Sequence, residues 1–135
     1  MPAITWNDNL VNHVKIVDEQ HMRLVDMINE FYAALSQKAA EAALVELLRG
    51  LIDYAGYHFS AEESLMNQYA YPAMRDHVQE HQAFTQRVEN WYRKVANGQL
   101  VLSFEITNYL RSWLVNHISV VDRKLCSFLK TKGVT

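Results

Sequence analysis

The sequence predicts an all-α protein: an antiparallel up-down-up-down four-helix bundle preceded by an N-terminal arm. Three observations support this fold class. Apolar and histidine residues recur every three or four positions in four separate segments, as expected for helices with one buried face. Four glycines and two prolines in 135 residues are too few for the frequent turns of a β-sandwich or barrel. No segment shows the alternating pattern of a strand.

The N-terminal arm is expected to span residues 1–17, where the apolar residues follow no helical period. Asp18 belongs to the residue types that cap helix N-termini, and it precedes the first periodic segment, residues 21–35. A polar stretch at residues 36–38 is expected to end that helix. The second periodic segment covers residues 44–69.

The second half of the chain repeats this organisation. Pro72 suits the first position of a helix, and the third periodic segment follows at residues 74–95. Asn97-Gly98 suits a helix C-terminus. Ser103 can then cap the fourth helix, whose periodic segment covers residues 106–128. Long helices joined by short connections favour the antiparallel arrangement.

Composition restricts the class of protein. Hydrophobic residues make up 50% and charged residues 21%, so we expect one folded domain, residues 1–135, with the bundle over residues 18–130. The formal charge of −2 gives no electrostatic reason to bind nucleic acid or an anionic membrane. No apolar run approaches the roughly 20 residues of a membrane span. Cys126 is the only cysteine and the N-terminus lacks a secretory signal, so we expect a cytoplasmic location without membrane insertion.

The four buried faces also carry residues that an apolar core does not normally contain. Five of the six histidines fall on them, together with two carboxylates. Any single histidine could be an ordinary core residue with a local partner, but a buried carboxylate costs several kcal/mol unless it is paired or bound to a metal. The set as a whole therefore indicates metal ligands: His21, His58, Glu62, His77, His81, His117 and Asp122.

The order of these groups along the chain places them in one layer. The first and third helices carry their groups near the beginning, and the second and fourth carry theirs near the end. In an antiparallel bundle these positions lie at the same end. The pairs His58–Glu62 and His77–His81 are four residues apart, so each pair shares one helix face. The pair His117–Asp122 is five apart, and its convergence needs a slight rotation or a local bulge.

Seven ligands exceed the four of a typical zinc site and suit two metal ions with bridging carboxylates. Imidazoles favour Fe, Zn, Cu or Ni. Neutral histidines hold iron in its reduced state better than a carboxylate-rich set does, which favours reversible O2 binding over oxidative chemistry. Glu63 points about 100° away from Glu62 on a helix, so we interpret it as a solvated or supporting group. We interpret Cys126 as a small core residue.

Four stretches match a known pattern in order and spacing: Asp18-Glu19-Gln20-His21; His58-Phe59-Ser60-Ala61-Glu62-Glu63-Ser64-Leu65-Met66; His77-Val78-Gln79-Glu80-His81; and Trp113-Leu114-Val115-Asn116-His117, followed by Asp122. On these motifs the sequence resembles the hemerythrins, specifically the single-domain bacteriohemerythrins. The resemblance runs from Trp6 to about Leu129, which is nearly the whole chain.

The resemblance implies a non-haem diiron centre with an oxo or hydroxo bridge and with O2 as its ligand. One iron would be held by His77, His81 and His117. The other would be held by His21 and His58 and would keep an open position for O2. Glu62 and Asp122 would bridge the two.

The family also places the leucine of its Trp-Leu-x-x-His stretch over the bound O2. This makes Leu114 a candidate wall of the O2 pocket, although its spacing alone fits an ordinary core residue equally well. Ile118, which follows His117, is a second candidate. The family usually has a small residue, often Gly, before the first ligand helix, where this chain has Asn12-His13. We interpret His13 as an arm residue and not as a ligand.

The expected function is therefore reversible O2 binding, for oxygen storage or for delivery to an oxygen-requiring enzyme, by a monomer that is not itself an enzyme. Two alternatives use the same metals. One is an O2 sensor. The other is an enzyme: a peroxidase or oxidase with iron, or a hydrolase with zinc activating water. No further acid–base set stands out beside the ligands, and no signalling module is attached, so the sequence favours the carrier.

Overall fold

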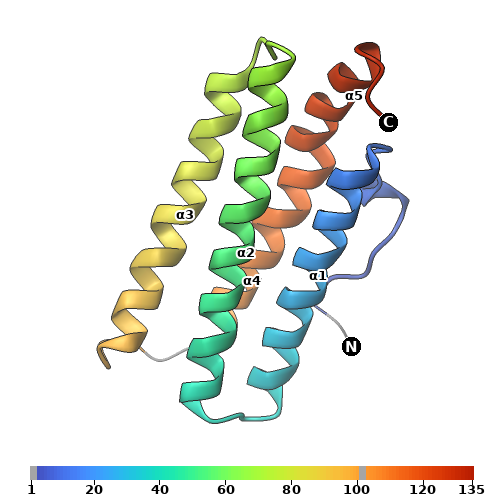
Figure 1. The fold of residues 1–135 in the computed structure, drawn as a ribbon. Helices are drawn as coiled ribbons and strands as arrows, with labels where there is room; N and C mark the ends of the chain where they lie inside the picture. Colours follow the sequence, from blue (N-terminus) through green and yellow to red (C-terminus); the bar gives the residue numbers. More distant parts are fainter. Residues whose placement is uncertain (1–2, 101–102) are drawn as a thin grey trace.

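The computed structural model describes residues 3–100 and 103–135, and over these residues it is all-helical. The expected four-helix bundle is confirmed: successive helices run antiparallel and lie side by side (Figure 1). The elements, in chain order, are η1 (Asp8–Leu10), α1 (Lys15–Ser36), α2 (Glu41–Gln68), α3 (Met74–Ala96), α4 (Phe104–Asn116), η2 (His117–Asp122) and α5 (Arg123–Thr131).

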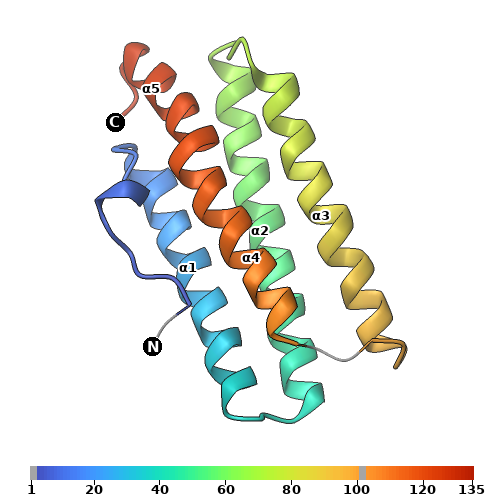
Figure 2. The same cartoon turned by 180° about the vertical axis from the view of Figure 1, so that it is seen from behind.

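The fourth rod of the bundle is made of three elements that continue one another. α4 leads into η2, a single π-helical turn, and η2 leads into α5 (Figure 2). From the five-residue spacing of the expected ligands His117 and Asp122, the sequence predicted either a slight rotation or a local bulge at this place. The structure has the bulge, a π turn whose hydrogen bonds span five residues.

The start of the first helix differs from the sequence prediction. α1 begins at Lys15, three residues before Asp18, so Asp18 is not its N-cap. The N-cap position is Val14, which makes no side-chain capping hydrogen bond. The Asp18 carboxylate instead accepts hydrogen bonds from the backbone N–H groups of Asn12 at 2.8 Å and His13 at 2.9 Å. It therefore closes the loop that precedes the helix.

Pro72 also has a role other than the predicted one. α3 begins at Met74, and Pro72 lies in the preceding turn. The backbone N–H of Met74 donates to the carbonyl of Tyr71 at 3.2 Å, which makes Pro72 the second residue of a four-residue turn. The fixed φ of proline suits that position. The other predicted stop is confirmed: α3 ends at Ala96, and Gly98 follows in the left-handed region, with φ 72°.

Two apolar clusters fill the bundle on either side of the predicted ligand layer. The larger includes Leu24, Phe59 and Leu110 and extends toward the α1–α2 connection. The smaller comprises Val14, Val17, Met66, Leu125, Cys126 and Leu129 at the opposite end. Cys126 is fully buried, as expected of a core residue. No helix in the described part of the chain is long and apolar enough to cross a membrane.

The N-terminal arm packs along the outside of the bundle, beside α1 (Figure 2). Ile4 and Leu10 are buried in the larger cluster, and Trp6 packs against it. The Asn29 side chain fixes the start of the arm, because it accepts from the Ile4 backbone N–H and donates to the Ile4 carbonyl, both at 2.9 Å.

His13 adopts a backbone conformation that favours glycine. Its φ is 64°, and its side chain is exposed. His13→Gly should therefore raise the free energy of unfolding by roughly 1 kcal/mol, because the contact between Cβ and backbone is removed. Urea denaturation measures this. Glu19→Gly, at an exposed position within α1, is the control and should lower stability by about 1 kcal/mol. A lower free energy of unfolding in His13→Gly than in wild type would show that the backbone of His13 is not strained.

Candidate metal centre

The structure brings all seven predicted ligand residues together in one buried layer. Each is at most 3% exposed. The beginnings of α1 and α3 and the ends of α2 and of the fourth rod lie at the same end of the bundle (Figure 1). The possible ligand atoms form two overlapping sets, in each of which they lie within 4.8 Å of one another. The first set is Glu62, His77, His81, His117 and Asp122, and the second is His21, His58, Glu62 and Asp122.

Both carboxylates belong to both sets, and each divides its two oxygens between them. Asp122 Oδ1 lies 3.0 Å from His77 Nε2 and 3.1 Å from His117 Nε2. Its other oxygen, Oδ2, lies 2.8 Å from His21 Nε2. Each carboxylate therefore stands between two groups of imidazoles, as a bridge between two cations would.

Glu62 is arranged in the same way. Its Oε1 atom lies 3.1 Å from His81 Nε2 and 3.5 Å from His77 Nε2. Its Oε2 atom lies 3.3 Å from His58 Nε2 and 3.5 Å from His21 Nε2. The layer is thus divided into a three-histidine side and a two-histidine side, with a carboxylate oxygen of Glu62 and one of Asp122 on each.

The π turn explains how Asp122 reaches this position. In a regular α-helix, residues five apart differ by about 140° around the axis, so a carboxylate at this spacing would point away from His117. The turn η2 extends the hydrogen-bonded loop by one residue and brings both side chains to the same side. Both residues are buried there, at 1% and 0% exposure.

Many polar atoms of the layer lack a hydrogen-bond partner, as expected of atoms that bind metal ions. In the described part of the chain, nine buried side-chain nitrogen and oxygen atoms have no hydrogen-bond partner, and all nine belong to the seven residues. They include both oxygens of Glu62 and of Asp122 and the Nε2 atoms of His21, His58 and His77. An unsatisfied buried polar group costs about 1–3 kcal/mol. Cations that accept these lone pairs would satisfy the Nε2 and carboxylate atoms together.

Three imidazoles are held from behind by hydrogen bonds on their Nδ1 atoms. The partner of His58 is the amide oxygen of Gln20 at 2.6 Å. A carboxylate oxygen of Glu63 lies 2.9 Å from Nδ1 of His81. Because these oxygens can only accept, Nδ1 carries the proton and the Nε2 lone pair faces the centre of the layer.

The third imidazole held in this way is His117, whose Nδ1 atom lies 3.1 Å from a carboxylate oxygen of Glu80. The sequence had assigned Glu63 only as a solvated or supporting group, and it had not singled out Gln20 or Glu80. The one available signal was that Gln20 and Glu80 each directly precede a predicted ligand histidine.

Aromatic side chains fix the planes of two of these rings. Phe59 stacks on His81, with ring centroids 4.0 Å apart and the planes 9° from parallel. Trp113 stacks on His117, with centroids 4.4 Å apart and the planes 12° from parallel. These contacts limit rotation of the imidazoles about their side-chain bonds, so their Nε2 atoms stay directed at the carboxylates.

Charges inside the layer stabilise one another. Burial lowers the pKa of His21, but attraction to Asp122 and contacts with Glu62 outweigh burial and raise it to about 9. In the same way the pKa of His77 rises to about 9, and that of His117 to about 10. Burial raises the pKa of both carboxylates, yet the surrounding histidines bring both below their usual values. A metal ion binds neutral imidazole, so it must displace protons from this network.

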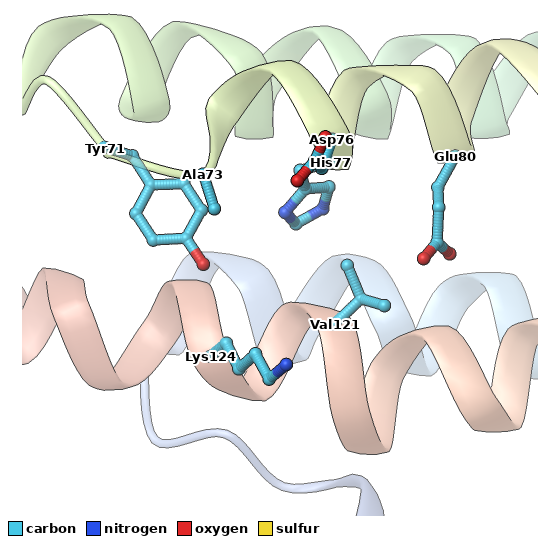
Figure 3. A pocket seen from close by; sticks show the side chains of 7 residues that line it. All are labelled: Tyr71, Ala73, Asp76, His77, Glu80, Val121 and Lys124. Carbon is cyan, nitrogen blue, oxygen red and sulfur yellow. The ribbon is translucent and has the colours of Figure 1, made fainter.

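The layer comes close to solvent beside His77. A cavity of about 150 Å³ adjoins this residue and lies between the start of α3 and the fourth rod. Figure 3 shows the His77 ring directed from α3 toward the fourth rod, with Glu80 further along α3 and Lys124 on the opposite side. Among the seven residues His77 is the most exposed, at 3%.

The two predicted pocket residues, Leu114 and Ile118, are buried, and they lie close to the ligand His117 in sequence. Leu114 is 4% exposed and Ile118 is 0% exposed, and both belong to the larger apolar cluster. Ile118 is the second residue of η2, directly after His117, and Leu114 lies one turn before it on α4. His13, by contrast, lies in the arm with its side chain exposed to solvent.

Comparison with known proteins also indicates a metal-binding domain. Residues 12–129 match the family described as the hemerythrin HHE cation binding domain. The chain is 36% identical over 118 residues to a bacteriohemerythrin of Pseudomonas aeruginosa (strain LESB58), covering 87% of this chain and 76% of that protein. It is 31% identical over 130 residues to a bacteriohemerythrin of Stenotrophomonas maltophilia (strain R551-3), covering 96% and 84%.

Solved structures agree with this comparison. The crystal structure of a wild-type hemerythrin superposes with a TM-score of 0.88 at 28% sequence identity, and the match covers 93% of this chain and 97% of that chain. A point mutant of a hemerythrin superposes with a TM-score of 0.90, also at 28% identity, covering 96% and 98%.

The two adjacent glutamates of α2 provide a direct test of the ligand assignment. Glu62→Ala should lose bound metal and lower the melting temperature, because it removes a carboxylate that faces both histidine groups. Glu63→Ala should retain the full metal content at saturation, because Glu63 contacts only the outer nitrogen of His81. Metal analysis and thermal unfolding of both variants measure this. Equal metal content in the two variants would show that Glu62 is not a ligand.

Proposed function

Because the chain belongs to the hemerythrin family, we propose that it binds O2 reversibly at a non-haem diiron centre, for oxygen storage or for delivery to an oxygen-requiring enzyme. The observation that carries this proposal is the division of the layer into two unequal ligand sets. One set has three histidines and the other has two, and both share the two carboxylates. A pair of metals held in this way has one member with fewer protein ligands, and therefore with room for a small molecule.

In this proposal His77, His81 and His117 would hold one iron, and His21 and His58 would hold the other. Glu62 and Asp122, which belong to both sets, would be shared by the two. When bound, the iron pair supplies the electrons and the open coordination position that reversible O2 binding needs.

The outer hydrogen bonds keep the imidazoles ready to bind. Gln20, Glu63 and Glu80 fix a proton on Nδ1 of their histidine partners, so that Nε2 is the atom that binds the metal, once any proton on it has been displaced. Two carboxylate partners act on the three-histidine side, and the neutral amide of Gln20 acts on the two-histidine side. This places more negative charge beside the metal that has no open position.

Apolar residues keep water away from the layer. We propose that Leu114 and Ile118 form part of the wall of the O2 pocket, since both are buried in the larger cluster and flank His117 in sequence. A dry wall excludes the water and anions that would compete with O2 and favour irreversible oxidation. In this role the two residues control access and contribute no chemistry of their own.

An enzyme or an O2 sensor built on the same two metals remains the alternative. Two cavities adjoin ligand residues: the one of about 150 Å³ beside His77 and one of about 420 Å³ beside His81. Both residues belong to the three-histidine side, and neither cavity is lined by His21 or His58. An organic substrate would need space beside the open position, and neither of these two cavities provides it, which counts against an enzyme that acts on an organic substrate.

Metal analysis combined with visible spectroscopy tests the proposed function. The protein should contain two irons per chain, because there are two ligand sets. Exposure to air should produce charge-transfer bands, and these bands should disappear under nitrogen and return in a second exposure. A single metal per chain, or bleaching that is complete after one exposure, would contradict reversible binding and support an oxidase.

The proposed pocket wall is tested by substituting Leu114. Leu114→Ala should speed oxidation of the iron centre in air well beyond the effect of its loss of stability, which is roughly 2–5 kcal/mol for a buried leucine. Leu48→Ala is the matched control, since Leu48 is also buried but lies nearly three helical turns from His58. Oxidation rates are followed by the decay of the O2-dependent bands. Similar rates in the two variants would indicate general loosening of the bundle and exclude a local role for Leu114.

A further inference from the structure

Hydrogen bonds attach the described part of the N-terminal arm to the bundle, and one of the attachment points is the π turn. Asn12, near the C-terminal end of the arm, is buried and only 2% exposed. The side-chain nitrogen of Asn12 donates a hydrogen bond to the backbone carbonyl of Ile118 at 3.0 Å. Ile118 lies within η2, between His117 and Asp122. Another attachment, from Asn29 to Ile4, lies on α1 and does not involve the π turn.

Arg123 strengthens the attachment from the other end of η2. It is the residue directly after the turn. Its Nε atom donates to the side-chain oxygen of Asn12 at 3.2 Å. Its Nη2 atom donates to the backbone carbonyls of Asn9 at 2.6 Å and Val11 at 3.2 Å. The arm is therefore bonded to both ends of the segment that carries Asp122.

The loop that presents Asn12 is itself fixed. Asp18, in the first turn of α1, accepts hydrogen bonds from the backbone N–H groups of Asn12 and His13. These bonds fix the backbone on both sides of the peptide that joins Asn12 to His13, whose φ of 64° lies in the left-handed region. Asn12 thus connects α1, through its backbone N–H, to η2, through its buried side chain.

A π turn needs support of this kind. It inserts one residue into a helix and displaces the backbone hydrogen bonds, so it is less stable than the α-helix on either side. Ile118 is fully buried, so the hydrogen bond that its carbonyl accepts from Asn12 is shielded from water and supports the turn from outside the helix. If η2 relaxed to a regular α-helix, His117 and Asp122 would no longer lie on the same side.

We propose that Asn12 and Arg123 are positioning residues, which hold η2 in its π conformation and thereby set the placement of His117 and Asp122 at the metal centre. The arm then forms a structural part of the centre, in addition to covering the bundle. This inference rests on the proposed function in one respect, namely that His117 and Asp122 are metal ligands.

The test compares two variants that each release one attachment of the arm. Asn12→Ala removes the bond to η2, and Asn29→Ala removes the bond to Ile4. Titration of each metal-free protein with Co²⁺, followed by its visible d–d spectrum, reports both affinity and ligand geometry. Asn12→Ala should bind Co²⁺ about 10- to 100-fold more weakly than wild type, with an altered spectrum. Asn29→Ala should retain the wild-type affinity and spectrum. Equal effects of the two variants would overturn the proposal, since the arm would then act only through general stability.

Hydrogen exchange gives a second readout that does not depend on which metal is bound. In the proteins as isolated, amides of residues 118–123 should exchange at least severalfold faster in Asn12→Ala than in Asn29→Ala. Equal exchange in this segment would overturn the inference even where Co²⁺ binding is weakened. If the wild-type protein bound fewer than two Co²⁺ ions, the proposed function would fail, and exchange alone would decide this inference.

Arg123→Lys is the conservative variant for the case in which Asn12→Ala does not fold. Lysine keeps a positive charge but cannot reach Asn12, Asn9 and Val11 together, so Co²⁺ affinity should fall by a smaller factor in the same direction. Wild-type affinity, spectrum and exchange in Arg123→Lys would contradict the positioning role.

Discussion

Burial of five imidazoles and two carboxylates at the centre of a helical bundle is the constraint on which the rest of the structure depends. Each group alone would be costly, because burial removes its hydration. Together they are compatible: ring nitrogens and carboxylate oxygens lie 2.8–3.5 Å apart, and each carboxylate presents one oxygen to each histidine group. Apolar clusters on both sides keep the layer dry, which strengthens its electrostatic interactions. Removal of any one member leaves its partners unpaired, so the layer acts as a unit that needs all four rods of the bundle.

The same elements that build the bundle also build the site. Antiparallel packing brings two helix beginnings and two helix ends to one level, and the seven groups are placed at these positions (Figure 1). A regular α-helix would direct Asp122 away from His117, and the π turn brings the two side chains to the same side. Gln20, Glu63 and Glu80 then orient imidazoles that belong to neighbouring helices. The centre therefore depends on contacts between helices as much as on the spacing within each one.

The sequence predicted the periodic features of this structure and missed the irregular ones. Buried faces and the common layer follow from residue spacing, and the five-residue interval between His117 and Asp122 predicted a local irregularity, either a rotation or a bulge. Asp18 and Pro72 were wrongly assigned to helix starts, because their residue types suit caps and loop closures equally well, and tertiary contacts decide between the two. The contacts of Glu80 and Asn12 could not be predicted from spacing, since their partners are 37 and 106 residues away in the chain. The one sequence signal for Glu80 was its position directly before His81.

The central claim is that this layer holds two metal ions between unequal groups of histidines. Anomalous diffraction at the iron absorption edge, from crystals of the protein grown with iron, tests it most directly. The account predicts two peaks in the layer, one bonded to Nε2 of His77, His81 and His117 and the other to Nε2 of His21 and His58, with Glu62 and Asp122 touching both. A single peak, or a second peak outside the layer, would contradict it.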